Sequence, residues 1–226
     1  MEEANTEEVI KQEKEKKSQE KKLKIIIYVM IIALLGFGLF IFLNQKLTPG
    51  TYKYVHGANT FDIQQIGTTE DGGITYRIKI FVNQDSSPKY INTRHEPKEM
   101  NGLKINPNVK QDLLTKKEAY ITINPNANLT GRTTIAALEI DKFLDNTYLF
   151  NIPTKSAFTE KYEKSENYTI KTCGDVTANT AIIWLRLGEE TAIKDEKGCV
   201  IVEAQTEDEL IKLSDGLAFY LLGMIG

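Results

Sequence analysis

A run of nineteen residues without a charged side chain, Ile25–Leu43, constrains this chain more than any other feature. As a helix rising about 1.5 Å per residue it would be roughly 28 Å long, close to the ~30 Å hydrocarbon core of a bilayer. The run has no polar stripe, which argues against a buried helix of a globular core, and it contains Gly36 and Gly38, which membrane helices tolerate. No small-residue cleavage motif follows it. We therefore expect an uncleaved transmembrane helix over residues 25–43 rather than a signal peptide.

The lysines around this run predict its orientation. Seven lysines precede it, and only Lys46 and Lys53 follow closely. Because lysines and arginines stay on the cytoplasmic side, the tail 1–24 is expected in the cytoplasm and the domain 51–226 outside. The tail balances its seven lysines with seven acids and is expected to be a solvated stub. The alternative is that its last lysines also bind anionic lipid head groups of the bilayer.

The part of the chain beyond the tail bears 21 basic and 24 acidic residues. With no basic surface indicated, nucleic acid is not an expected partner. No dinucleotide fingerprint, phosphate loop or G-x-S-x-G elbow is present, so no cofactor is expected. After a linker at 44–50, residues 51–226 have the size of a single domain.

Periodicity predicts an α+β (mixed α/β) domain with one mixed sheet packed by two main helices. The alternation over Ile74–Val82 indicates a half-buried strand in an antiparallel hairpin with residues 59–66, and the proline-containing segment 83–108 is expected to be irregular. The near-continuous apolar stretch Ala181–Leu187 predicts a strand buried on both faces. Further strands are expected at 51–55, 118–123, 148–152, 191–194 and 199–204, and helices at 109–116, 131–146 and from Thr206 onward.

One connection and both ends of the last helix can also be predicted. The helix at 131–146 should cross over between two strands of one sheet, in the right-handed sense if they are parallel. Thr206 and Glu209 have the spacing of a capping box at the start of the last helix, and Gly223 is placed to end it.

The cysteines, Cys173 and Cys199, both lie in the outer domain. In an extracytoplasmic domain a disulfide is the favoured interpretation, with two buried free thiols or a metal site as alternatives. Two cysteines without a neighbouring histidine cannot complete a tetrahedral zinc site, so no metal is expected. A bridge would close a loop of 25 residues and add about 3 kcal/mol of stability.

Only two segments offer candidate chemistry. His95 lies in Arg94-His95-Glu96-Pro97 with Glu99 nearby, but no oriented partner for acid–base catalysis is visible in the sequence. Cys173 is a conceivable nucleophile if the fold supplies His95 and Arg186, although the bridge is the simpler interpretation. We therefore assign no catalytic, cofactor-binding or metal-binding residue.

Three other residues have local interpretations. Trp184 lies inside the most apolar strand and is expected in the core. Asn128-Leu129-Thr130 and Asn167-Tyr168-Thr169 are glycosylation sequons, so Asn128 and Asn167 are candidate acceptors in loops outside the membrane.

Several segments together resemble a group of archaeal membrane-anchored proteins of uncharacterised function. They are Arg94–Pro97, Ala119–Pro125, the alanine-rich helix Thr134–Leu144, Asn179–Leu187, Gly198–Glu203, Thr206–Lys212 and Leu217–Met224. The strand followed by an acid-capped helix also resembles the C-terminal domain of archaeal surface-layer proteins. These likenesses imply a single N-terminal transmembrane helix and an extracytoplasmic α/β domain, and they carry no catalytic residues over.

The sequence therefore favours a single-pass cell-membrane protein whose outer domain binds another envelope protein or has a structural role, without catalysis. The alternatives are a membrane-anchored extracytoplasmic enzyme that uses cysteine or histidine, and a pilin-like assembly subunit. A pilin would need a processing site directly before the helix, and Lys24-Ile25-Ile26 does not provide one. Homo-oligomerisation is left open.

Overall fold

The computed structural model describes residues 21–22, 24–40, 50–69, 72–81, 87–163 and 167–226. The chain divides into two units, residues 1–49 and 50–226. In the first unit, residues 24–40 are helical, and we call this segment the N-terminal helix. The end of the predicted span, residues 41–43, lies outside the described residues, as do residues 1–20 of the tail and 44–49 of the linker. Within the ranges above, no helix is both long and apolar enough to cross a membrane.

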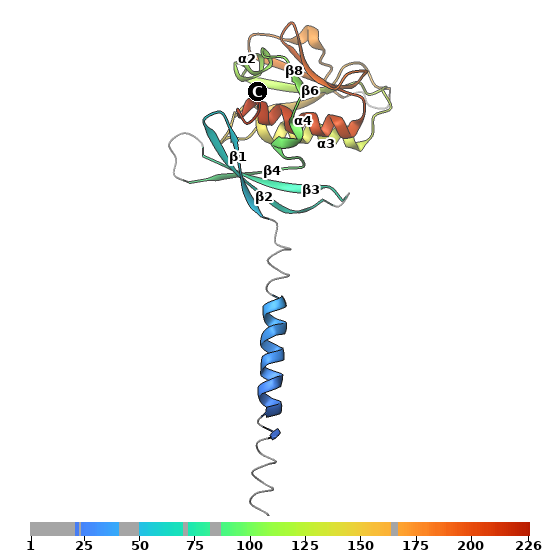
Figure 1. The fold of residues 1–226 in the computed structure, drawn as a ribbon. Helices are drawn as coiled ribbons and strands as arrows, with labels where there is room; N and C mark the ends of the chain where they lie inside the picture. Colours follow the sequence, from blue (N-terminus) through green and yellow to red (C-terminus); the bar gives the residue numbers. More distant parts are fainter. Residues whose placement is uncertain (1–20, 23, 41–49, 70–71, 82–86, 164–166) are drawn as a thin grey trace, which may run out of the picture. The chain divides into compact units, whose positions relative to one another are not determined.

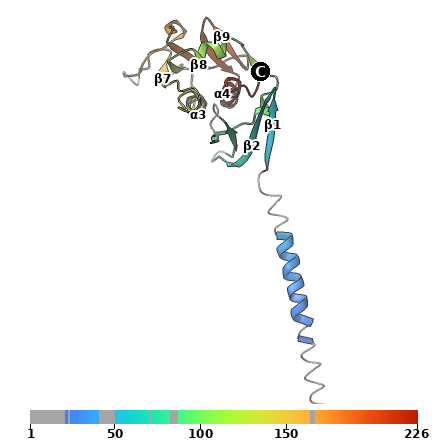
Figure 2. The ribbon, with the colours of Figure 1, turned by 90° about the vertical axis from the view of Figure 1, so that its left-hand side faces the viewer.

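The second unit, which we call the head, has three layers: two sheets with helices between them (Figures 1 and 2). Sheet A is an antiparallel meander of β1 (Thr51–His56), β2 (Asn59–Thr68), β3 (Ile74–Ile80) and β4 (Lys89–Thr93). Sheet B has the order β5 (Lys104–Ile105), β9 (Ala192–Glu196), β10 (Cys199–Ala204), β8 (Thr180–Leu187), β6 (Glu118–Ile123) and β7 (Thr154–Phe158). The helical elements are η1 (Pro97–Met100), α2 (Val109–Leu114), α3 (Gly131–Leu144), η2 (Cys173–Asp175) and α4 (Glu207–Leu221).

Helices α3 and α4 hold the two sheets together because each helix buries side chains in both directions. Toward sheet B, Ile140 and Leu217 pack with the inner face of β8 and β10. Toward sheet A, Phe143 and Phe219 pack with Ile63 and other apolar residues of the meander. The core is therefore double, with the helix pair as the shared layer.

The parallel part of sheet B confirms the predicted crossover. β6 and β7 are parallel neighbours joined through α3, and β8 pairs in parallel with both β6 and β10. The apolar strand predicted at Ala181–Leu187 is β8, which buries Ile183 toward the helices and Ile182 on the opposite face. This is the pattern of a strand covered on both sides.

The two ends of α4 show which of the predicted capping interactions are present. Gly223 has φ +70°, and the N–H groups of Gly223 and Met224 donate to the carbonyls of Tyr220 and Phe219, which is a Schellman ending as predicted. At the start, the Thr206 hydroxyl accepts from the Glu209 N–H at 3.2 Å. The reciprocal half of the predicted capping box is wrong, because the Glu209 carboxylate accepts from Gln205 N and from the Thr191 hydroxyl instead.

Other expectations need correction. The head has two sheets rather than one mixed sheet, because the hairpin at its start joins β4 in a meander of its own. Segment 83–108 contains β4, η1 and β5 within what was expected to be irregular chain. Residues 148–152 form no strand, and the strand of this region is β7, where Ala157 is buried. The predicted end of the third strand, Val82, lies outside the described residues.

Candidate functional site

A buried carboxylate joins α4 to the chain that follows β4. Asp215 is fully buried, and its Oδ2 accepts hydrogen bonds from the backbone N–H of Arg94 at 3.1 Å and of His95 at 3.0 Å. The same oxygen lies 2.9 Å from His95 Nδ1. A carboxylate withdrawn from water is costly unless such donors replace the water. Asp215 therefore fixes both the backbone and the imidazole of this segment, which we call the β4 loop (residues 94–96).

The imidazole of His95 is oriented by this contact. Its side chain is 23% exposed, and the backbone carbonyl of His95 accepts a hydrogen bond from the Thr93 hydroxyl at 2.8 Å. With Nδ1 donating to Asp215, Nε2 is the nitrogen left to meet a ligand or a proton. Carboxylates orient catalytic histidines in this way. Over the described ranges, however, no hydroxyl or thiol is hydrogen-bonded to the ring.

Two further ionisable side chains on α3 extend this cluster. Arg94 Nε lies 3.3 Å from Glu139 Oε1, and Lys142 is hydrogen-bonded to the other carboxylate oxygen. Burial lowers the pKa of Lys142 to about 8; the Asp215 carboxylate opposes this shift, and the Arg94 charge adds to it. Charges of both signs thus meet where the β4 loop lies on the helix pair.

A hollow of about 170 Å³ opens beside the β4 loop. Its polar lining comes from Arg94 and His95 of the loop, Arg132 of α3 and Asp208 of α4. Arg132 and Asp208 form an ion pair across the first turns of the two helices. Gly73 and Ile211 complete the wall. Among the described residues, charged or titratable side chains of both the β4 loop and the two helices therefore line this hollow.

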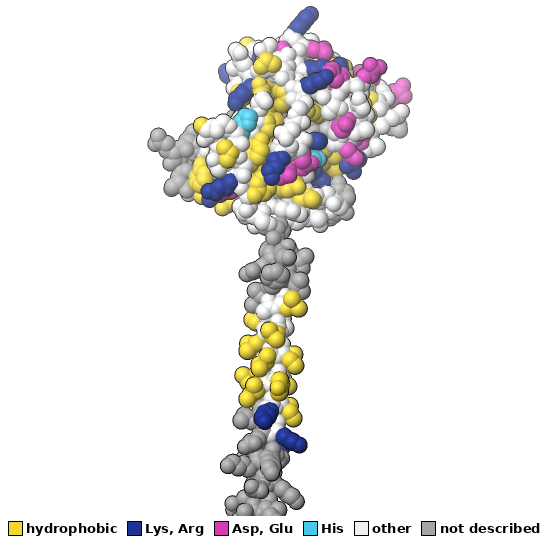
Figure 3. Space-filling view, in the orientation of Figure 1, with side chains coloured by type: hydrophobic (Ala, Val, Ile, Leu, Met, Phe, Trp, Pro, Cys, Tyr) yellow, Lys and Arg dark blue, Asp and Glu magenta, His cyan; other side chains and the backbone are white. Residues whose placement is uncertain are grey.

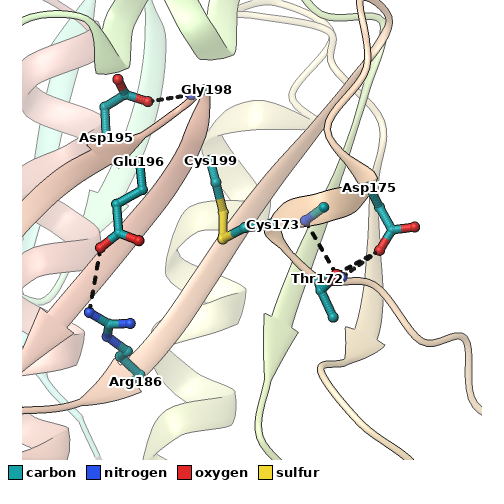
Figure 4. Close-up of a disulfide and its surroundings, with 9 residues drawn as sticks. Thr172, Cys173, Asp175, Arg186, Asp195, Glu196, Gly198 and Cys199 are labelled. Carbon is teal, nitrogen blue, oxygen red and sulfur yellow. Dashed lines mark hydrogen bonds and ion pairs between the residues drawn. A yellow bond between two sulfur atoms is a disulfide. The ribbon is translucent and has the colours of Figure 1, made fainter.

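The two cysteines lie elsewhere, on the outer face of sheet B (Figure 4). The sulfur atoms of Cys173 and Cys199 are 2.08 Å apart, and the Cα atoms are 5.2 Å apart, so the predicted bridge is present in the structure. The bridge fixes η2 on the outer face, where Cys199 packs with Ile182 and Ile201. It therefore holds in place the segment that covers this face of the sheet.

The constellation considered for a cysteine nucleophile is not assembled. Cys173 is bonded to Cys199, and His95 is held by Asp215 on α4, which packs on the opposite face of sheet B. Arg186 is also engaged, since its guanidinium lies 2.6 Å from the Glu203 carboxylate. Local sequence spacing cannot reveal which face of a sheet each residue will occupy.

The remaining residues singled out from sequence occupy separate places. Trp184 is half-buried on the outer face of sheet B, with the Arg186 guanidinium 4.8 Å from its ring centroid, so it is less enclosed than expected. Asn128 and Asn167 are both exposed and lie outside regular elements, where sequon acceptors are expected. His56 ends β1 and lines a different hollow beside Tyr54.

Within the described ranges, no group of three or more His, Cys, Asp or Glu side chains is placed to hold a metal ion. Sequence reasoning missed Asp215 and Glu139, which form the buried part of the cluster. Asp215 did carry a signal, because it is a charged residue in the middle of the apolar stretch Leu210–Leu221.

No protein-family model, no curated protein and no solved structure matches this chain.

Proposed function

We propose that this chain is a membrane-tethered protein of the cell envelope whose extracytoplasmic head acts by binding rather than by catalysis. The observation that carries the tether is the exposure of the N-terminal helix. Thirteen of its large apolar side chains, between Ile25 and Phe40, are 46–69% exposed. Figure 3 shows apolar side chains along the visible face of the helix, with basic side chains at its lower end.

Water is a poor environment for such a helix. Exposed apolar area costs about 25 cal/mol for each Å², and apolar side chains all around a helix are typical of membrane spans. The lysines Lys21, Lys22 and Lys24 precede the apolar part, which supports a cytoplasmic N-terminus by the positive-inside rule. An insertion of residues 25–43 in the bilayer would remove this surface from water.

The disulfide supports an extracytoplasmic head. Stable bridges form in oxidising compartments and are rare where thiol-reducing systems operate. Cys173 and Cys199 are bonded in the head, whereas the tail 1–24 contains no cysteine. The archaeal resemblance, a pilin-like role and homo-oligomerisation stay predictions.

Membrane extraction tests the tether. The full chain should sediment with membranes, resist alkaline carbonate and be released by detergent. Replacing Ile31 and Leu35 by lysine should shift it to the carbonate-soluble fraction, since each central lysine costs roughly 2.5–3.5 kcal/mol of insertion. Leu138→Lys is the matched control, because Leu138 is an exposed apolar residue of the head. Release of the unmodified chain by carbonate would contradict the tether.

A second candidate function, a histidine-dependent enzyme, is favoured by one observation: the His95–Asp215 contact. It predicts that the full chain turns over a simple ester or phosphate substrate, and that His95→Gln abolishes this turnover. Such a result would replace the binding proposal, whereas turnover that persists in His95→Gln would come from a contaminant or another site.

A further inference from the structure

We propose that a second hollow of the head binds a small zwitterion, an α-amino acid with an apolar side chain. This hollow has a volume of about 280 Å³ and lies between η1, the turn that follows it and helix α4. The inference goes beyond the binding role proposed above and rests on the geometry of the head alone, so it does not depend on the tether.

The basic group of this hollow is Lys212, a half-buried lysine of α4. Among the residues that the structure describes, no hydrogen bond, ion pair or ring contact engages its ammonium group. A half-buried ammonium has given up part of its water without gaining an acceptor in the protein. It is therefore available to donate charge-assisted hydrogen bonds to the carboxylate of a ligand.

Two carboxylates, Glu99 of η1 and Glu209 of α4, line the same hollow. Glu209 Oε2 accepts hydrogen bonds from the Thr191 hydroxyl at 3.0 Å and from Gln205 N at 3.1 Å, which hold the side chain in place. Glu99 Oε1 accepts one hydrogen bond, from the N–H of Glu96 at 2.9 Å. Its other oxygen has no hydrogen-bond partner within the described ranges, so Glu99 is the acceptor that we assign to the ammonium of the ligand.

The opposite charges line one concavity without pairing with each other. In the described part of the chain, no ion pair joins Lys212 to Glu99 or to Glu209. An α-amino acid carries its ammonium and its carboxylate on the same carbon atom, so one molecule can pair with both Lys212 and Glu99. Each contact then uses an atom that lacks a partner in the protein, whatever the net charge of the surroundings.

The buried part of the lining is apolar and closely packed. Met100 is 4% exposed and Leu213 is 1% exposed, and Leu103 packs beside them. At Gly216 an added Cβ would lie 2.6 Å from Leu103 Cδ2 and 3.3 Å from Met100 Sδ, so α4 lies directly against these side chains. An apolar ligand side chain that packs here leaves water, which favours binding. Since this surface is already fixed, little conformational entropy is lost when a ligand binds.

The volume of the hollow limits the ligand. Pockets for drug-sized molecules usually exceed about 300 Å³, so a hollow of about 280 Å³ suits a molecule of the size of one amino acid. The described lining contains methionine and leucine side chains and no aromatic ring. L-leucine is therefore the first probe.

Calorimetric titration of the full chain in detergent tests the site with three probes of related carbon skeleton, at pH 7 and constant ionic strength. They are L-leucine, 4-methylpentanoate, which lacks the ammonium, and 3-methylbutylamine, which lacks the carboxylate. We expect saturable binding of leucine with a dissociation constant in the millimolar range or below. Each analogue should bind roughly tenfold more weakly, because one charge-assisted contact is lost. Absence of saturable leucine binding, or an analogue that binds as tightly as leucine, would overturn the proposal.

Two variants assign the contacts. Lys212→Met should weaken leucine binding by roughly tenfold and leave the affinity for 3-methylbutylamine unchanged, a selective loss that a general loss of stability cannot produce. Glu99→Gln keeps an acceptor for the Glu96 N–H and should weaken the binding of both leucine and the amine. Lys110→Met is the matched control, because Lys110 is an exposed lysine of α2 outside the hollow. Equal weakening by Lys110→Met, or unchanged leucine affinity in Lys212→Met, would contradict the assignment.

Discussion

The N-terminal helix and α4 are both rich in large apolar residues, but these residues are exposed in the N-terminal helix and buried in α4. Ten of the fifteen residues of α4 are buried, because sheet A covers one side of the helix and sheet B the other. In the N-terminal helix the apolar side chains stay exposed. The comparison shows that apolar content alone does not make a helix part of a core. α4 is a core helix because the two sheets of the head cover its apolar side chains.

The charged side chains on the N-terminal side of the two helices also differ. The first turn of α4 contains Glu207, Asp208 and Glu209, which complement the positive end of the helix dipole. The chain before the apolar side chains of the N-terminal helix instead carries the basic residues Lys21, Lys22 and Lys24. Under the proposed tether, these lysines would lie on the cytoplasmic side of the membrane, as the positive-inside rule requires.

The largest expected effect comes from truncating the buried face of α4. Leu217 is 1% exposed, so Leu217→Ala should lower the free energy of unfolding of the head by about 2–5 kcal/mol. Ile32→Ala in the N-terminal helix, where the side chain is 68% exposed, should change it by less than about 0.5 kcal/mol. Denaturant titration followed by the fluorescence of Trp184, the single tryptophan, measures both. Equal losses would break the contrast between the helices.

The next largest effect is expected from removing the disulfide, which holds η2 on the outer face of sheet B. The double variant Cys173→Ser and Cys199→Ser should lose about 3 kcal/mol, since the unfolded chain regains the entropy of an open loop. The reduced wild type should unfold at the same denaturant concentration as the variant. A reductant that destabilised the double variant as well would point to an effect unrelated to these sulfurs.

A smaller effect is expected at the start of α4. Thr206→Ala removes the hydroxyl that accepts from Glu209 N and should cost about 1 kcal/mol. Thr206→Ser retains the acceptor and should stay near wild type. Thermal unfolding monitored by circular dichroism distinguishes them, and equal losses in both variants would show that the methyl group rather than the cap matters.

The smallest effect is a pH dependence at Glu207. Burial alone would raise the pKa of Glu207, but hydrogen bonds from the Thr130 hydroxyl and N–H outweigh burial and lower it. A folded-state pKa below the unfolded value of about 4.3 means that Glu207 stabilises the head above that pH. This stabilisation is lost as the pH falls through the lowered pKa.

The variant Glu207→Gln should therefore be less stable than wild type at pH 7, by up to about 1 kcal/mol. The two unfolding free energies should converge as the pH falls below 4. Asp208→Asn serves as the control at the exposed neighbouring position. A difference that persists unchanged at pH 3 would assign the loss to shape rather than charge.

Much of the fold could be predicted from local pattern. β6 and β10 were predicted with their observed bounds, because apolar β-formers there end at Asn-Pro or begin after Gly198. β4 was missed because Lys89–Thr93 is short, follows a proline and buries only Ile91 and Thr93. The strand expected at 148–152 was wrong because Leu149 and Phe150 pack on the core from a turn, whereas the true edge strand β7 is mostly polar.

The candidate site was only half predictable. His95 drew attention in the sequence, but its partner Asp215 is 120 positions away, and only the folded helix pair brings them into contact. Glu139 and Arg132 lie in the predicted helix 131–146, where nothing in the sequence singles them out. One chain contains no local signal for pairing between such distant positions, so the cluster required the structure.

The shared helix layer also has a consequence for synthesis. Sheet A is complete once residue 93 has been made, since its strands are neighbours along the chain. Its apolar face is covered in part by Ala218, Phe219 and Met224, which are translated after the strands β1 to β10. A nascent head therefore carries an incompletely covered sheet A until α4 and Met224 have been made. We expect stalled chains that end before α4 to be bound by chaperones or lost to proteases, although most of their strands are already present.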